Sequence, residues 1–222
     1  IFIILLRNQI HEAMPRVKPF EEYPDQYEQW FEKNNAVYES ELQALKTLLP
    51  KGKKVVEIGV GSGRFAAPLN IRTGIEPSEQ MRKLARKRGI DAREGLAENL
   101  PFDDSQFDFA LMVTTICFLD DIEKAFREVH RILKPDGEFI VGFIDKESAV
   151  GQMYQQHKNE SVFYNIATFY SVDEVISYLK RTGFRDFEFV QTIFRNLKEI
   201  KEPEPVKTGY GEGSFVGINA KV

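Results

Sequence analysis

The stretch of sequence that decides the fold is Val55-Val56-Glu57-Ile58-Gly59-Val60-Gly61-Ser62-Gly63. Four residues, three of them apolar, are followed by three glycines that alternate with other residues. A short apolar run is typical of a strand buried in a sheet, and glycine lets the backbone turn tightly and approach a ligand closely. The stretch therefore predicts a buried strand that ends in a ligand-binding loop.

Helices and strands alternate outward from this loop. We expect an aromatic-rich amphipathic helix between residues 20 and 50, a short helix at 63–69, and further helices at 78–89, 120–133 and 171–183. Strands are expected at 55–58, 71–76, 91–95, 107–113, 138–144, 184–194 and 215–222. This alternation predicts a Rossmann-like, doubly wound α/β domain. Its seven-stranded sheet is mostly parallel, with a C-terminal antiparallel hairpin.

The length of 222 residues suits one such domain, which we place at residues 20–222. The irregular, aromatic segment at about 145–170 is expected to form a lid. Residues 1–19 are interpreted as an N-terminal extension without an assigned function. Its apolar run at 1–6 is too short to span a bilayer, which needs about 20 residues.

Composition points to a small partner. Lys and Arg number 30 against 34 Asp and Glu, which gives no global attraction for nucleic acid or anionic membranes. The single cysteine, Cys117, and three widely separated histidines offer no metal-ligand spacing, so no metal is predicted. A lone cysteine also favours a cytoplasmic protein. The oligomeric state is not predicted.

In an open α/β sheet, ligands bind beyond the carboxyl ends of the strands. The glycine loop lies at one such end, and Glu76 lies at the next, 76 − 59 = 17 residues after Gly59, where an acid can accept hydrogen bonds from a ribose. Arg64 stands where a dinucleotide fingerprint needs its third small residue. The loop therefore predicts a nucleoside-containing cofactor and disfavours an NAD-dependent dehydrogenase, which remains a third alternative.

Four segments in order resemble the motifs of class I S-adenosylmethionine-dependent methyltransferases, especially the small-molecule enzymes of the Methyltransf_11 type. They are the G-x-G-x-G loop, Ile75-Glu76-Pro77-Ser78 with Met81, Glu98-Asn99-Leu100-Pro101-Phe102 with Phe107-Asp108, and Glu128-Val129-His130-Arg131-Ile132-Leu133-Lys134-Pro135-Asp136-Gly137. The resemblance covers about residues 20–222. It implies S-adenosylmethionine as cofactor and methyl transfer to a small-molecule acceptor.

The resemblance also implies roles for individual residues. Gly59, Gly61 and Gly63 belong to the loop for the methionine portion, with Glu57 behind it; Glu76 takes the ribose, and Pro77, Met81, Leu96 and Ala97 take the adenine. Leu96 replaces the family's usual Asp, so the adenine amino group is left to Glu98 or a backbone carbonyl. Tyr27 and Trp30 resemble the aromatic residues near the sulfonium, and Thr114 is expected to line the methyl-transfer site.

In-line methyl transfer depends mainly on alignment, so no catalytic residue is assigned. If the acceptor needs a base, the candidates are Tyr27, Tyr164 and His157. The departure at Leu96 keeps open an alternative function, that of a non-catalytic S-adenosylmethionine-binding or regulatory module.

Overall fold

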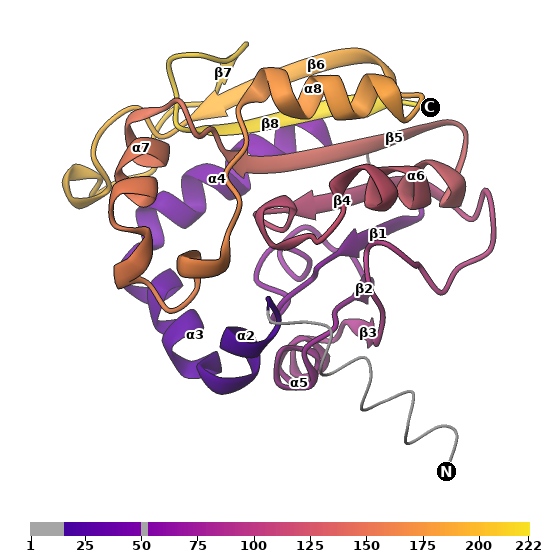
Figure 1. Ribbon diagram of the computed structural model, residues 1–222, viewed down its shortest axis with the longest axis horizontal. Helices are drawn as coiled ribbons and strands as arrows, with labels where there is room; N and C mark the ends of the chain where they lie inside the picture. Colours follow the sequence, from indigo (N-terminus) through magenta and orange to yellow (C-terminus); the bar gives the residue numbers. More distant parts are fainter. Residues whose placement is uncertain (1–15, 50–52) are drawn as a thin grey trace.

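The computed structural model describes residues 16–49 and 53–222, and its centre is an eight-stranded sheet in the order β3-β2-β1-β4-β5-β8-β6-β7 (Figure 1). The strands are β1 Val55–Ile58, β2 Thr73–Ile75, β3 Asp91–Arg93, β4 Phe107–Val113, β5 Leu133–Ile144, β6 Arg185–Thr192, β7 Lys207–Thr208 and β8 Phe215–Lys221. The helices are α2 Lys18–Glu22, α3 Pro24–Lys33, α4 Asn35–Leu48, α5 Glu79–Lys87, α6 Ile122–Ile132, α7 Ala149–Gln156 and α8 Val172–Arg181. Short 3-10 helices are η1 Ile116–Phe118, η2 Lys158–Glu160, η3 Tyr164–Ile166 and η4 Leu197–Glu199.

The order in which the chain adds strands to the sheet reverses at β1. From β1 the chain adds β2 and β3 on one side, and β4 and β5 then form on the other side. All of these strands are parallel, with Val56 opposite Thr73 of β2 and Ala110 of β4. The carboxyl ends of β1 and β4 therefore flank the point where a doubly wound sheet binds its ligand.

The C-terminal strands complete the sheet in antiparallel fashion. β8 lies between β5 and β6, with Val141 of β5 opposite Ile218. The doubly wound α/β prediction with its C-terminal hairpin is thus confirmed, but the sheet has eight strands rather than seven. The additional strand, β7, pairs Lys207 and Thr208 with β6; two exposed residues are too few for a hydrophobic pattern to reveal.

Helices cover both faces of the sheet. Phe126 of α6 and Val175 of α8 pack against one face, whereas Leu45 of α4 and Ala85 of α5 pack against the other. Figure 1 shows α6 and α8 together in front of the sheet and α4 behind it. The two apolar clusters hold the strands from both sides, and this fixes the strand ends that carry the loops.

The N-terminal part of the domain differs from the expected single helix, because α2, α3 and α4 are separate. The breaks fall at Tyr23 and Asn34, which have non-helical backbone angles, and Pro24 occupies the first position of α3. The helix expected at 63–69 was wrong, since residues 64–70 form turns. Of the expected extension, residues 1–15 lie outside the described residues, whereas Lys18 and Pro19 already belong to α2.

Helix caps explain where α6 and α8 begin. The helix expected from residue 120 begins at Ile122, because Asp121 caps α6 by accepting a 2.9 Å hydrogen bond from the Lys124 N–H. The helix expected at 171–183 begins with a capping box, in which Ser171 accepts from the Glu174 N–H and Glu174 accepts from the Ser171 N–H. Between β5 and α8, residues 145–170 form α7, η2 and η3 and lie beside α3 and α4 at one end of the sheet (Figure 1).

Candidate cofactor and acceptor site

The glycine loop turns sharply after β1. Gly59 and Gly61 have φ angles of 71° and 53°, in the left-handed region that side chains disfavour. A Cβ on Gly59 would come within 2.4 Å of Thr115 Cγ2, and one on Gly61 would come within 3.1 Å of the Tyr27 hydroxyl oxygen. Glycine at these two positions lets the loop approach Tyr27 and Thr115 closely.

Gly63 has a different place in the loop. A Cβ at this position would lie 3.3 Å from the Cα of Ala85 in α5. Gly63 therefore lets the loop pack closely against this helix, and it does not line the cleft described below.

Glu76 follows β2 and is held by the glycine loop and the start of α5. Its Oε2 accepts a 2.9 Å hydrogen bond from the Gly61 N–H, and its Oε1 accepts a 2.8 Å hydrogen bond from the Ser78 N–H. Burial raises the pKa of Glu76 to about 7, although these hydrogen bonds and the nearby Arg82 oppose the shift. Each oxygen keeps a lone pair, so the fixed carboxylate can accept two further hydrogen bonds.

Glu57 lies at the end of β1 and is almost fully buried. Its Oε2 atom has no hydrogen-bond partner among the described residues, and burial together with the Glu76 charge raises its pKa well above the usual range. A backbone hydrogen bond at Ala66 opposes this shift. Glu57 is 1% exposed and does not line the cleft described below.

A cleft of about 820 Å³, measured out to open solvent, lies over the ends of β1, β2 and β4. The predicted site residues that line it are Tyr27, Gly59, Gly61, Glu76, Pro77, Leu96, Ala97, Glu98 and Thr114. Four other predicted residues, Trp30, Glu57, Gly63 and Met81, do not line it. Trp30 packs edge-on against Phe31, and Met81 is fully buried in α5.

Leu96 and Glu98 lie at one wall of this cleft. Leu96 forms a short antiparallel bridge with Asn99, whose N–H donates to the Leu96 carbonyl at 3.1 Å. The Glu98 Oε1 atom accepts a 3.0 Å hydrogen bond from the Asp120 N–H. Glu98 therefore ties the loop after β4 to this wall.

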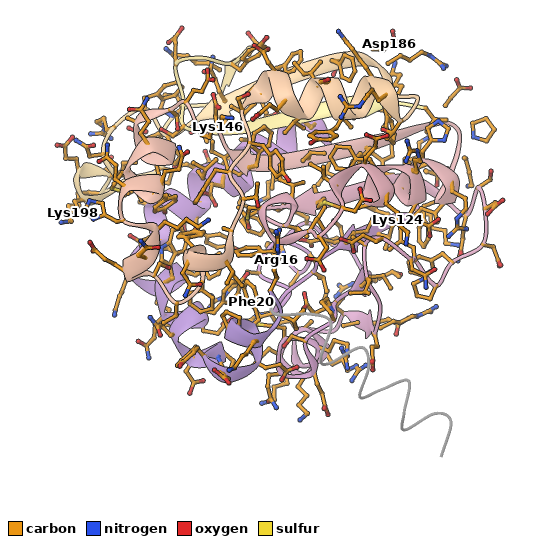
Figure 2. All side chains as sticks on the ribbon, viewed as in Figure 1. Arg16, Phe20, Lys124, Lys146, Asp186 and Lys198 are labelled. Carbon is orange, nitrogen blue, oxygen red and sulfur yellow. The ribbon has the colours of Figure 1, made fainter. Side chains whose placement is uncertain are left out.

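The N-terminal segment contributes walls that sequence reasoning missed. Arg16, Val17 and Phe20 line the cleft, and the Arg16 guanidinium donates to the Leu119 carbonyl and pairs with Asp120 at 3.3 Å. Figure 2 shows Arg16 and Phe20 in the interior of the view, where the N-terminal helices meet the rest of the domain. No motif marks this segment, although Phe20 belongs to the aromatic cluster seen in the sequence.

The turn after β4 adds the remaining missed residues. Thr114 has a φ angle of 48° and donates its N–H to the Gly142 carbonyl at 2.7 Å, and the Thr115 hydroxyl donates to Gly59 and Val113 carbonyls. This turn also brings Phe118 to the cleft. The only available sequence signal was its place directly after a strand.

A second space, which we call the aromatic cavity, adjoins the cleft at Thr114. Its volume is about 340 Å³, again measured out to solvent. Its walls come from the turn after β4, the end of β5 and the 145–170 segment, namely Thr114, Ile116, Cys117, Phe143, Ile144, Tyr154, Tyr164, Phe169 and Tyr170. Burial raises the pKa of the Cys117 thiol to about 12, so this thiol stays protonated.

The three candidate bases occupy different surroundings. Tyr27 lines the cleft and Tyr164 lines the aromatic cavity, and burial raises the pKa of both phenols. His157 has an exposed side chain 3.1 Å from Glu160 and lines neither space. Only the two tyrosines are therefore placed to meet a ligand.

Residues 16–49 and 53–222 contain neither a candidate metal site nor a membrane-spanning helix. No group of three or more His, Cys, Asp or Glu side chains in these ranges is arranged to hold a metal ion. None of the helices described is both long enough and apolar enough to cross a membrane.

The sequence is similar to that of known methyltransferases and of an uncharacterized archaeal protein. A family described as a methyltransferase domain (Methyltransf_11) matches residues 56–141. The uncharacterized protein MJ1123 of Methanocaldococcus jannaschii is 45% identical over 202 residues, which span 91% of this chain and 98% of that protein. Demethylmenaquinone methyltransferase of Chlorobaculum tepidum is 34% identical over 91 residues, or 38% of each chain.

A solved structure resembles nearly the whole chain. It is a Thermotoga maritima protein named a SAM-dependent methyltransferase and possible histamine N-methyltransferase, with 52% sequence identity and a TM-score of 0.91. The match covers 92% of this chain and 99% of that one. The similarity therefore includes the N-terminal helices and the 145–170 segment as well as the sheet.

Proposed function

Because this chain belongs to the class I S-adenosylmethionine-dependent methyltransferases, we propose that it transfers the methyl group of S-adenosylmethionine to a small-molecule acceptor bound beside Thr114. The family membership makes S-adenosylmethionine the cofactor. The observation that carries the proposal is the fixed carboxylate of Glu76, which lines the cleft between the N–H groups of Gly61 and Ser78.

The residues of the cleft fit this cofactor. Glu76 offers its remaining lone pairs to the two ribose hydroxyls, and Gly59 and Gly61 line the part of the cleft in which we place the methionine portion. Pro77 and the Leu96–Ala97 wall provide apolar surface for the adenine.

When bound, the cofactor supplies a methyl group on a positively charged sulfur, which is already a good leaving group. The protein's own contribution is alignment, which by itself can supply several kcal/mol of acceleration. Thr114 lies where the cleft and the aromatic cavity meet, and Tyr27 presents its ring beside the glycine loop. These residues would orient the acceptor and exclude water from the reacting atoms.

The shape of the site supports a small acceptor. The N-terminal helices close one side of the cleft, and we propose that the 145–170 segment acts as a lid over the aromatic cavity. Phe163 of this segment packs against Phe20 of α2 with 5.3 Å between ring centroids. We also place the reaction in the cytoplasm, because the only cysteine of the chain is a free, protonated thiol.

Calorimetric titration with S-adenosylmethionine and S-adenosylhomocysteine tests the cofactor assignment. We expect one site per chain, and a Glu76→Ala variant that folds but binds at least tenfold more weakly. A folded wild-type protein that binds neither compound would refute the proposed function.

A non-catalytic cofactor-binding or regulatory module is the second candidate. It is favoured by Leu96, whose side chain cannot accept a hydrogen bond from the adenine amino group. Incubation with methyl-labelled cofactor and a broad panel of small acceptors separates the two candidates. Labelled product supports the enzyme, whereas cofactor binding without label transfer to any acceptor supports the module.

A further inference from the structure

Glu28 of α3 joins this helix to the glycine loop and to α5. Its Oε2 atom accepts hydrogen bonds of 3.0 Å from Arg64 Nε and 2.5 Å from Arg88 Nη2. Arg64 directly follows Gly63, and Arg88 is the C-terminal cap of α5. We call these three charged residues the Glu28 ion cluster; their side chains are only 15%, 22% and 27% exposed. A shielded charge that loses its partner is costly, so the three residues depend on one another.

The Glu28 carboxylate is charged at neutral pH. Burial opposes its ionisation, but hydrogen bonds that include those from Arg64 and Arg88 lower the pKa of Glu28 below its usual value. A second carboxylate of α3, that of Glu32, lies 3.8 Å from Arg64 Nη2, but its side chain is 69% exposed. Neutralising Glu28 would therefore leave two shielded guanidinium groups without their shared partner, whereas neutralising Glu32 would remove an exposed pair that contributes little.

The ion cluster also holds the backbone of the glycine loop. Arg88 Nη1 donates to the Ser62 carbonyl at 2.8 Å, and the Tyr38 hydroxyl of α4 donates to the Arg64 carbonyl at 2.5 Å. These two carbonyls belong to the residues on either side of Gly63. Ser62, Arg64 and Arg88 do not line the cleft. The loop is therefore restrained by contacts made outside the cleft.

Helix α3 also forms one wall of the cleft. Tyr27 directly precedes Glu28 and lines the cleft, and its hydroxyl oxygen would be 3.1 Å from a Cβ on Gly61. The same helix thus meets the loop through Tyr27 inside the cleft and through Glu28 outside it. The separation of α3 and the loop, and with it the width of the cleft at Gly61, therefore depends on the ion cluster.

We propose that Glu28 is a positioning residue for cofactor binding: through Arg64 and Arg88 it holds α3 against the glycine loop, so that Tyr27 stays beside the methionine portion of the cofactor. This inference rests on the proposed function, because it concerns the same cofactor site. Glu28 does not line the cleft, so it acts only through its partners. A wall and a loop that are held in place before the ligand arrives lower the cost of binding it.

Glu28→Gln tests the proposal, because it removes the charge and keeps the shape. Two ligands are compared by calorimetry: S-adenosylhomocysteine, and 5′-methylthioadenosine, which lacks the amino acid end and is measured by competition. We expect the variant to bind S-adenosylhomocysteine about tenfold more weakly, and to release it about tenfold faster in stopped-flow displacement, because the binding-competent arrangement is less populated. The affinity for 5′-methylthioadenosine should change by about twofold or less.

The matched control is Glu32→Gln, which removes the same charge from the same helix at an exposed carboxylate beside the same arginine. Its affinities for both ligands should equal those of wild type. Combining Glu28→Gln with Arg88→Gln should lower the affinity for S-adenosylhomocysteine by less than the two single effects together, because both disrupt one cluster. Tyr38→Phe removes one hydroxyl from the loop and should give a smaller loss with the same preference between ligands. If Glu28→Gln does not fold, the two ligands are compared with Tyr38→Phe instead.

Three results would overturn the inference. They are an unchanged affinity for S-adenosylhomocysteine in Glu28→Gln, an equal loss for both ligands, and an equal loss in Glu32→Gln. An equal loss for both ligands is the result of a purely structural role, because a smaller folded fraction weakens every ligand alike. Failure of wild type to bind either ligand is a separate result, which would remove the proposed function itself.

Discussion

Replacing Glu76 by glutamine should weaken cofactor binding and also change how the stability of the empty protein depends on pH. The folded-state pKa of Glu76 is about 7, above the value of 4.5 expected without the fold. The stability associated with its protonated form is therefore fully present below pH 4.5 and is lost as the pH rises through 7. Glutamine does not titrate, so the variant should lack this loss.

The size of the effect follows from the two pKa values. A shift from 4.5 to about 7 corresponds to about 3 kcal/mol over the whole range, of which about 1.4 kcal/mol falls between about pH 6 and about pH 8.5. The new amide also places an NH₂ group against one of the two N–H donors, Gly61 or Ser78. This cost of about 1–3 kcal/mol is independent of pH, so it shifts the stability curve without changing its slope.

Urea unfolding of wild type and Glu76→Gln at these two pH values measures the difference, and Glu160→Gln serves as the control for loss of a surface charge. The free energy of unfolding of wild type should fall by about 1.4 kcal/mol more than that of the variant. Calorimetry should show cofactor binding weakened by roughly tenfold or more, the loss of a hydrogen bond to a charged group. Parallel stability changes together with unaltered cofactor affinity would refute the role given to this carboxylate.

Three other substitutions test the framework around the site. Gly59→Ala should destabilise the protein by about 1–3 kcal/mol in urea unfolding and abolish cofactor binding, because the new Cβ would meet Thr115. Adding Thr115→Ala to this variant should recover part of the lost stability. Wild-type stability of the Gly59→Ala single variant would contradict this explanation. Ser171→Ala removes the cap of α8 and should cost about 1 kcal/mol in thermal or urea unfolding, whereas an unchanged midpoint would mean that the cap contributes nothing. Phe126→Ala should lower the free energy of unfolding, measured in urea, by about 3–5 kcal/mol, because this ring of α6 is fully buried. A decrease below about 1 kcal/mol would show that neighbouring side chains fill the space that the ring leaves.

The central fold was predictable because its signals are local. The strand Val55–Ile58 and the glycine loop after it can be recognised from nine consecutive residues. The capping box of α8 requires only Ser171 and Glu174. The break before Pro24 also had a local signal, since proline favours the first position of a helix. By contrast, β7 has two exposed residues and forms only because β6 lies beside it.

The residues of the candidate site also divide into those that the local sequence could assign and those that depend on distant contacts. Residues that follow a strand, such as Glu76, could be assigned to the cleft from their order along the chain. Arg16 could not, because its contacts with Leu119 and Asp120 join segments more than 100 residues apart. Trp30 was expected near the methionine portion, but its ring packs on the neighbouring Phe31 and does not line the cleft.

The segments that we propose to enclose the acceptor come before and after the conserved-fold region, residues 56–141, in the sequence. The region similar to other methyltransferases, residues 56–141, carries the glycine loop, Glu76 and the turn after β4. Phe20 comes before this region, and Tyr154 and Tyr164 come after it. If the proposed function holds, substitutions in these flanks should change which molecule is methylated while the strands and the cofactor loop stay the same. Evolution can diversify the substrates of such a protein by changing its two ends and keeping its middle.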